Sequence, residues 1–372
     1  MIMEKLTLKH IKNLNWRLIL NVTLIFIFGL VMLTTATHAN RTGNYREIMK
    51  QLLAFGIGVA LIIFTIKIDY IKIGKFYNVF YIFTIILLLV IWVPGLGVVQ
   101  EGSRRWIKLG PLYLQTSEIA KLTFIISYAK IAEGYKGKLN TIKQIIPAVL
   151  KAMPVLFLML MQPDLGGTIV FICIMFGMLF VSGLNGKIIR NTILIGVLLL
   201  PLIYTCLAPH QKVRIEAFLN PNDLSYKGNY QVVQSMIAIG SGGVKGKGLY
   251  EGTQSQNGFL PVPDSDFIFA VIGEELGLIG MGALVLLYGA FLLTMIKDAE
   301  ESKDFYGTLI IIGVTSMFAY QIIQNIGMTM ALIPVTGITL PFISYGASSL
   351  VGSLAALGLA LNVGMRKRKI NF

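Results

Sequence analysis

The sequence predicts an all-α polytopic membrane protein, and three observations lead to this fold class. Hydrophobic residues make up 55% of the 372 residues and charged residues 13%, about half of the roughly 25% that soluble proteins carry. Ten apolar stretches are long enough, at about 17 to 25 residues, to cross the hydrocarbon layer as helices. No soluble domain, low-complexity tract or short-period repeat interrupts them, so we expect one integral membrane domain over residues 1–372.

The predicted spans follow the apolar runs in chain order. The fourth is the least apolar, because Glu118 and Lys121 fall inside it. The start of the chain is basic like a signal peptide, but its apolar run is too long and no A-x-A site follows, so we interpret it as a retained span. The ten spans cover residues 16–36, 50–66, 77–95, 114–133, 145–161, 164–184, 191–209, 266–296, 306–333 and 349–365.

The distribution of Lys and Arg predicts the orientation. Ten spans place both termini on one side, and that side carries the excess of Lys and Arg that is typical of cytoplasmic loops. Both termini are therefore expected in the cytoplasm. The formal net charge of +14 then follows largely from orientation and does not imply nucleic acid as a partner. Two cysteines in apolar runs and three scattered histidines indicate neither a disulfide framework nor a metal cluster.

One outer connection is much longer than the others. Residues 210–265 form a single extracellular loop between spans seven and eight, of about 55 residues, and loops this long in a compact fold are usually functional. The stretches VRIEAFLN and QVVQSMIAIG within it are amphipathic. We expect two or three short helices that lie along the membrane surface.

Charged side chains inside the bilayer are costly, at roughly 2.5 to 3.5 kcal/mol on insertion scales, and normally face a cavity and find partners. Glu118 and Lys121 are three residues apart and share a helical face. They form either a structural ion pair or part of a functional site. Asp164, in MQPDLGG, is either the cap of span six or a cavity residue. Spacing alone leaves both alternatives open.

More carboxylates lie where the long outer loop meets span eight, in LPVPDSDFIFAVIGEELG. Asp264 and Asp266 stand at the membrane edge, and each is able to cap the helix. Glu274 and Glu275 lie two turns further along. We expect a paired or protonated glutamate there, because two buried neighbouring carboxylates without partners are unfavourable. Together with the charges of spans four and six, Asp266 predicts a charged cavity in the outer half of the membrane.

The presence of basic residues on the predicted outer side is not explained by membrane orientation, which favours Lys and Arg on the cytoplasmic side. They are Arg104, Arg105 and Lys108 in GSRRWIKLG, and Lys245 and Lys247 in SGGVKGKGL. Glycine lets backbone amides approach an anion, so a phosphate-bearing ligand is one interpretation and anchoring to lipid headgroups is the other. The stretch PVTGITLPFISYGASS is rich in Gly, Pro, Ser and Thr. Irregular backbone of this kind at membrane depth must be buried in protein or line a cavity.

Four segments together resemble a known family. The chain is similar to the SEDS family (shape, elongation, division and sporulation), and most of all to its RodA branch. The segments follow the family's order and read GSRRWIKLGPLYLQTSEIAKL, MQPDLGG, GLYEGTQSQNGFLPVPDSDFIFAVIGEELGLIG and NIGMTMALIPVTGITLPFISYGASS. Thr116 stands where the family has proline, and Ala331 and Ala347 stand where it has glycine. These departures affect local backbone geometry rather than charged groups.

The resemblance implies a peptidoglycan glycosyltransferase that polymerises lipid II at the outer face of the bacterial cytoplasmic membrane during cell elongation. It implies that the essential aspartate is Asp266, in the segment SDFIFAV, and that Glu118, Lys121 and Asp164 are the cavity residues of the family. It further implies, as partners, a class B penicillin-binding transpeptidase and other membrane proteins of the elongation complex.

These elements combine into one hypothesis. Asp266 acts as general base on the attacking sugar hydroxyl, and cations neutralise the pyrophosphate of the departing undecaprenyl pyrophosphate. Substrate-binding roles fall on Arg104, Arg105, Lys108, Glu118, Lys121, Asp164, Lys245 and Lys247. Glu118 and Asp164 orient Lys121 or the sugars, or they bind a divalent cation. Two rival functions remain, a lipid II transporter, which needs polar groups through the full membrane depth, and a non-catalytic scaffold.

Overall fold

The computed structural model describes residues 13–38, 46–100, 103–109, 112–162, 164–206, 209–220, 223 and 227–367. The chain is mostly helical, and a helix occupies each of the ranges for which the sequence predicts a span. These helices are α2 (Trp16–His38), α3 (Arg46–Ile66), α5 (Tyr77–Leu89), α6 (Thr116–Glu133), α7 (Ile142–Met161), α8 (Leu165–Val181), α9 (Gly186–Cys206), α13 (Ile268–Glu300), α14 (Phe305–Thr329) and α15 (Ala347–Gly364).

Six of these helices are both long and apolar enough to cross a membrane, namely α2, α3, α7, α13, α14 and α15. α8 and the run formed by α5 and the short 3-10 helix η1 (Val90–Trp92) are apolar but shorter. α6 is less apolar because it carries four charged side chains. The prediction of a polytopic membrane protein is therefore confirmed in outline.

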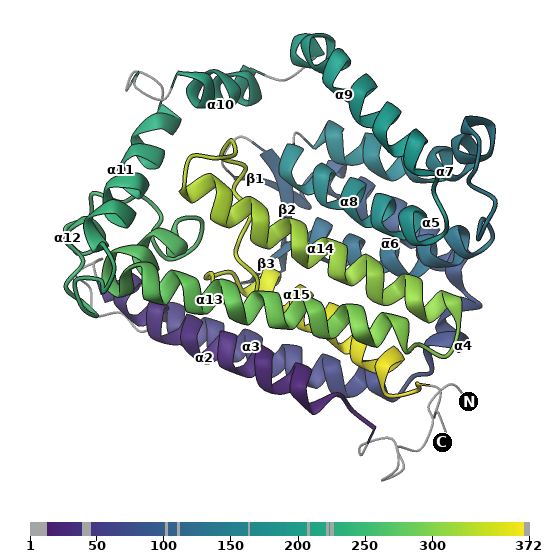
Figure 1. Ribbon diagram of the computed structural model, residues 1–372, viewed down its shortest axis with the longest axis horizontal. Helices are drawn as coiled ribbons and strands as arrows, with labels where there is room; N and C mark the ends of the chain where they lie inside the picture. The colour runs from purple at the N-terminus through teal and green to yellow at the C-terminus, as the bar shows by residue number, and fades with distance from the viewer. Residues whose placement is uncertain are drawn as a thin grey trace.

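α14 and α15 form the centre of the molecule (Figure 1). Most of their side chains are buried; α14 packs against α6, α8 and α13, and α15 packs against α3. α3, α5 and α7 instead expose large apolar side chains such as Phe64, Phe83 and Phe157. A contiguous exposed apolar surface marks a region that contacts another apolar phase, so these helices are suited to face lipid.

The expectation of an all-α fold is wrong in one respect. β1 (Gly97–Gln100), β2 (Ser103–Leu109) and β3 (Leu112–Gln115) form a small antiparallel sheet before α6, with β2 in the middle. Trp106 of β2 pairs with Val98 on one side and with Gln115 on the other. The basic residues of GSRRWIKLG obscure this pattern. The sequence signal that indicates strands is the presence of Gly102 and Gly110 between short runs that contain β-branched and aromatic residues.

The long connection between α9 and α13 contains three helices. They are α10 (Pro209–Leu219), α11 (Lys227–Gly242) and α12 (Thr253–Gln256), which agrees with the expected short helical pieces. α9, α10 and α11 run along the upper and left edges of the molecule in Figure 1. α11 packs against α13, and Ser235 Oγ donates to the Thr329 carbonyl at the end of α14, at 2.8 Å. This loop is thus joined to the helices that surround the molecule's centre.

The start of α2 and the ends of α13 and α15 lie together. Asn15 Nδ2 donates to Asp298 Oδ2 at 2.8 Å, and Lys367 Nζ lies 2.6 Å from Asp298 Oδ1. Burial lowers the pKa of Lys367, but its contacts with Asp298 and Glu301 raise that pKa overall. The short helix α4 (Tyr70–Gly74) is at the same end, since Arg366 Nε lies 4.0 Å from Asp69 Oδ1. Both described ends of the chain are therefore on one side of the molecule.

α13 is interrupted near its start by Gly277. This residue has φ 63° and ψ −160°, a conformation that is essentially restricted to glycine. The interruption leaves backbone groups without helical partners, and the segment 243–248, in the connection between α9 and α13, forms hydrogen bonds with them. The hydrogen bonds run from Lys247 N to Glu274 O (3.0 Å), from Gly248 N to Glu275 O (3.0 Å), from Leu278 N to Gly243 O (2.9 Å) and from Ile279 N to Val244 O (3.2 Å). We refer to these bonds as the Gly277 interlock.

Replacing Gly277 with Ala is expected to destabilise the protein. A Cβ there would lie 2.4 Å from the Gly246 nitrogen, and the backbone conformation disfavours any side chain. Backbone strain of this type costs about 1 to 3 kcal/mol, so the apparent Tm in detergent should fall by several degrees. Gly282→Ala is the control, because no atom lies within 4 Å of a Cβ at that helical position and alanine suits a helix better than glycine. Equal Tm values for the two variants would contradict the role of Gly277.

Candidate active site

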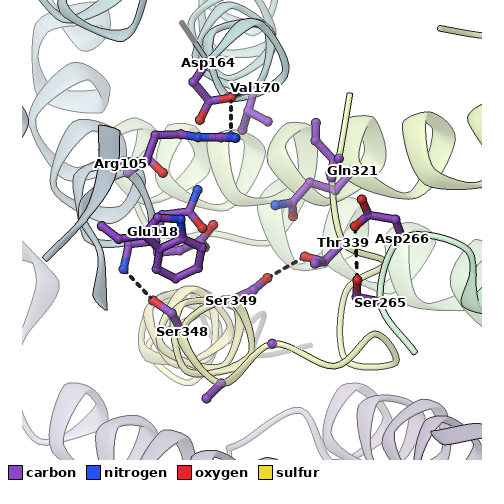
Figure 2. A pocket seen from close by; sticks show the side chains of 18 of the residues that line it. Arg105, Glu118, Asp164, Val170, Ser265, Asp266, Gln321, Thr339, Ser348 and Ser349 are labelled. Carbon is purple, nitrogen blue, oxygen red and sulfur yellow. Dashed lines mark hydrogen bonds and ion pairs between the residues drawn. The ribbon is translucent and has the colours of Figure 1, made fainter. Parts of the chain in front are cut away.

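A cavity of about 390 Å³ lies where the sheet, α3, α6, α8, α14 and the segment 335–346 converge. Pockets of roughly 300 to 1,000 Å³ are the usual size for small-molecule sites. Figure 2 shows carboxylate, amide and hydroxyl side chains from these segments facing one another. The segment 335–346 is non-helical, and Gly337, Thr339 and Tyr345 line the cavity. The sequence predicts that this irregular backbone is either buried in protein or lines a cavity, and in the structure part of it lines a cavity.

Asp266 lies on the wall of the cavity, in the non-helical segment before α13 (Figure 2). Its side chain is partly buried, and Ser265 Oγ lies 3.4 Å from its Oδ1 and donates to it. A Cβ added to Gly337 would lie 3.5 Å from its Oδ2, so the opposite wall comes close to the carboxylate. Asp264 is not among the residues that line the cavity; burial raises the pKa of its carboxyl, although backbone hydrogen bonds act in the opposite direction. The structure thus distinguishes the two aspartates.

Glu118 and Lys121 form a buried ion pair in the first two turns of α6. Lys121 Nζ lies 2.8 Å from the Glu118 carboxylate, and both side chains line the cavity. Their spacing places them on one helical face, and an acidic residue in the first turn also suits the helix dipole. Gly352 of α15 packs against this pair, since a Cβ there would lie 2.9 Å from Glu118 Oε2. The pair is therefore both a buried ion pair and part of the cavity wall, and its functional role stays a prediction.

Asp164 also serves in two ways. It is the N-cap of α8, where its Oδ1 accepts a hydrogen bond from Gly167 N at 2.8 Å. The same oxygen lies 3.3 Å from Arg105 NH1, and both side chains line the cavity (Figure 2). Arg105 Nε is buried and has no hydrogen-bond partner in the described part of the chain. An unsatisfied donor in a polar cavity indicates a place for a ligand acceptor.

The other predicted basic residues are not all brought to this cavity. Arg104 and Lys108 belong to β2, but their side chains lie outside the part of the structure that is described. Lys245 is exposed, and neither it nor Lys247 is among the described residues that line the cavity. Lys247 Nζ instead lies 2.8 Å from Glu274 Oε1. Its glycine neighbours take part in the Gly277 interlock, so the pattern SGGVKGKGL has a structural role, and the substrate-binding role of Lys245 and Lys247 stays a prediction.

Glu274 and Glu275 are completely buried, and the expected paired glutamate is confirmed for Glu274. Besides Lys247, Glu274 accepts hydrogen bonds from Gln254 N and Ser255 N at 2.7 and 2.9 Å. Glu275 accepts one from Gln256 Nε2 at 3.1 Å. Both glutamates precede the break at Gly277 and accept hydrogen bonds from the segment 247–256, which lies in the connection between α9 and α13. Neither carboxylate is therefore without a partner.

Several cavity residues carry no sequence signal that we could recognise. Lys50 of α3 lines the cavity, although its position in the sequence only counts toward membrane orientation. Gln321 comes from the apolar helix α14 and likewise has no such signal. Ser348 and Ser349, at the start of α15, differ because they belong to the stretch PVTGITLPFISYGASS, which the sequence predicts to be buried or to line a cavity. Ser348 Oγ accepts from Gln115 N at 3.2 Å, and the Ser349 and Thr339 hydroxyls are 2.8 Å apart (Figure 2). The place of a single polar residue in an apolar helix becomes clear only from the way that the helix packs.

The charges of the cavity are nearly balanced. Among the side chains that the structure describes, the lining includes the cations Lys50, Arg105 and Lys121 and the carboxylates Glu118, Asp164 and Asp266. Glu118 and Asp164 each already hold a cation. No group of three or more His, Cys, Asp or Glu side chains gathers within the described residues. The arrangement suits a ligand that combines hydroxyl groups with an anionic group.

The chain matches the family model described as cell cycle protein, FtsW/RodA/SpoVE, over residues 15–369. It is 35% identical over 360 residues to stage V sporulation protein E of Bacillus subtilis (strain 168), a match that covers 94% of this chain and 97% of that protein. It is 36% identical over 349 residues to the probable peptidoglycan glycosyltransferase FtsW of Francisella salina, covering 91% and 86% of the two chains.

Solved structures show the same fold. A chain from a structure described as structural coordination of polymerization and crosslinking by a peptidoglycan synthase complex has a TM-score of 0.81 and 29% identity, covering 94% of this chain and 97% of that one. The rod shape determining protein RodA of Thermus thermophilus has a TM-score of 0.71 and 28% identity, covering 96% and 98%. On the family match and these relatives, the chain belongs to the FtsW/RodA/SpoVE family, the SEDS family that its motifs resemble.

Proposed function

We propose that the protein is a peptidoglycan glycosyltransferase that polymerises lipid II, with Asp266 as its general base. The observation that carries the proposal is the position of Asp266 on the wall of a cavity lined by hydroxyl, amide and cationic side chains. Such a wall suits a sugar that is linked to a diphosphate. Relatives that are named probable peptidoglycan glycosyltransferase support the same activity.

The proposed reaction joins the 4-hydroxyl of one lipid-linked disaccharide to the anomeric carbon of another. Asp266 accepts the hydroxyl proton while the new C–O bond forms. The bond from the anomeric carbon to the diphosphate breaks, and its electron pair leaves with undecaprenyl pyrophosphate. A positioned base contributes about 10² to 10⁴ in rate. Direct displacement converts an α-linked donor into a β-linked glycan, so no covalent sugar intermediate is needed.

The cavity cations are proposed to stabilise the charge that develops on the leaving diphosphate. Arg105 and Lys50 both line the cavity. Lys121 lies in the same cavity, held by Glu118. Asp164 and Glu118 thus act by fixing the two cations that they contact. Arg104 and Lys108 remain candidates by their place in β2.

We propose that all ten predicted spans cross the membrane, with both termini in the cytoplasm and the cavity facing outward. The joined ends of α2, α13 and α15 support this topology, because an even number of crossings returns the chain to its starting side. The connection 210–265 is then extracellular. Polymerisation would take place at the outer face of the bacterial plasma membrane, and the prenyl chains would stay in the lipid.

We further propose a role in cell elongation together with a class B penicillin-binding transpeptidase and other elongation-complex membrane proteins. The likeness to RodA and to a chain of a peptidoglycan synthase complex supports this role. The relatives in division and sporulation, FtsW and stage V sporulation protein E, define the alternatives within the same family. Restoration of rod shape in a strain that lacks its own elongation polymerase would distinguish them.

The test of the activity is direct. The purified protein, with its transpeptidase partner, is incubated with lipid II in detergent, and the products are separated by length. We expect long glycan strands. Absence of polymer, combined with movement of labelled lipid II across sealed vesicles, would replace the proposal with transport. If the protein neither makes polymer nor moves lipid II, the result would favour a non-catalytic scaffold.

A further inference from the structure

The backbone segment that carries Asp266 accepts hydrogen bonds at three consecutive carbonyls, those of residues 264–266. Tyr345 N donates to the Asp264 carbonyl at 2.9 Å, Ser344 Oγ donates to the Ser265 carbonyl at 2.6 Å, and Asn325 Nδ2 donates to the Asp266 carbonyl at 3.1 Å. These residues precede α13 and belong to no helix or strand. Backbone carbonyls outside regular structure need partners of this kind. The donors come from α14 and from the segment 335–346.

Asn325 links the aspartate to the opposite wall of the cavity. Its Nδ2 carries two hydrogens, and it also donates to the Ile338 carbonyl at 2.8 Å. The amide is completely buried. The reverse orientation would place the amide oxygen against two carbonyl oxygens, so the chemistry fixes which atom faces them. Asn325 therefore sets the distance between Asp266 and the segment that contains Gly337 and Thr339.

Ser344 is fixed in a similar way. Its hydroxyl donates to Ser265 and accepts from Leu340 N at 2.9 Å. Its own carbonyl accepts from Gln51 Nε2 of α3 at 3.0 Å. The hydroxyl is thus oriented by its neighbours before it contacts the aspartate segment. Neither Ser344 nor Asn325 is among the described residues that line the cavity.

We propose that Asn325 and Ser344 are positioning residues for Asp266, acting on its backbone to hold the carboxylate at the distance from the substrate hydroxyl that proton transfer requires. The inference rests on the proposed function. A misplacement of about 1 Å at a reacting group can cost roughly 100-fold in rate. Because the two side chains do not contact the cavity, their loss should change the rate and leave substrate affinity unchanged.

The experiment compares two buried amides that are neighbours on α14. Asn325→Leu removes the bonds to Asp266 and Ile338. Gln324→Met is the matched control, because Gln324 Nε2 donates to the Pro334 carbonyl at 2.9 Å in the adjoining stretch but makes no bond to residues 264–266. We expect Asn325→Leu to lower kcat by at least about 10-fold with KM for lipid II within about twofold. Gln324→Met should keep kcat within about twofold of the wild type.

Ser344 provides a second test that uses a smaller change. Ser344→Ala should lower kcat, whereas Ser344→Thr, which keeps a hydroxyl, should restore much of it. The acid limb of the pH profile of kcat should keep its midpoint in every variant, because the bonds are made to the backbone and leave the carboxylate chemistry unchanged.

Three results would overturn the proposal: normal kcat in folded Asn325→Leu and Ser344→Ala, an equal loss in Gln324→Met, or a rise in KM at constant kcat. If Asn325→Leu does not fold, the two Ser344 variants decide the matter. If the proposed function itself is wrong, the wild-type protein will make no glycan, and this result differs from each of the three above.

Discussion

Asp266→Asn is expected to lower the rate of glycan polymerisation by about 10² to 10⁴-fold, the contribution of a positioned general base. The amide has nearly the same size as the carboxylate but cannot accept the hydroxyl proton. The cavity and the fold should remain intact, because the bonds that hold this segment are made to its backbone carbonyls. The measurement is the initial rate of polymer formation from lipid II, with KM and Tm determined for the same preparation.

Asp264→Asn is the matched control for this prediction. Asp264 has the same side chain two residues earlier, but it does not line the cavity. Its replacement should therefore leave the rate within a few-fold of the wild type. A near-normal rate for Asp266→Asn would exclude Asp266 as the base, and a loss confined to Asp264→Asn would assign the role to its neighbour.

Glu118→Gln is expected to lower both stability and activity. The change leaves the Lys121 ammonium buried without its carboxylate, and breaking a buried pair in this way typically costs about 3 to 5 kcal/mol. The side chains are 10% and 5% exposed, so solvent screens the pair only weakly. Apparent Tm in detergent and polymerisation rate are the two measurements. The double variant Glu118→Gln/Lys121→Met should recover stability, because it no longer contains an unpaired charge, but it should not recover activity.

α6 offers a control with the same geometry. Lys130 and Glu133 are also three residues apart and 2.6 Å from each other, but their side chains are 39% and 30% exposed. Exposed pairs contribute about 0 to 1 kcal/mol, so Glu133→Gln should hardly change Tm or rate. Similar losses in Glu118→Gln and Glu133→Gln would show that burial of the first pair is not what matters. Full activity in the double variant would show that Lys121 does not act on the substrate.

The helices could be predicted from sequence because apolar length is a local property. Each long apolar run needs only its own hydrophobicity to specify a helix that crosses lipid. The sheet β1–β2–β3 was not predicted, because its strands are short and its basic residues resemble a headgroup anchor. Its existence depends on pairing between three segments, such as Trp106 with Gln115, which no single segment reveals.

The candidate site was partly predictable for a similar reason. Glu118, Lys121 and Asp164 are costly in a membrane, so their presence alone signals a partner or a cavity. Lys50 and Gln321 are polar residues without that signal, and only the packing of α3 and α14 brings them to the cavity. Lys245 and Lys247 show that one pattern can have more than one explanation. Their glycine-rich surroundings suggest an anion site, and in the structure Gly246 also permits close contact with α13.

The Gly277 interlock has a consequence for chain length. Surface loops usually tolerate insertions and deletions, but the segment 243–248 is hydrogen-bonded to α13 through the backbone of Gly243, Val244, Lys247 and Gly248. Inserting or deleting one residue there would place each amide opposite the wrong carbonyl and move Gly246 away from the break that admits it. The register of this stretch is therefore set by the helix that it binds, and a change of length within it is expected to be tolerated less well than a change in an ordinary surface loop.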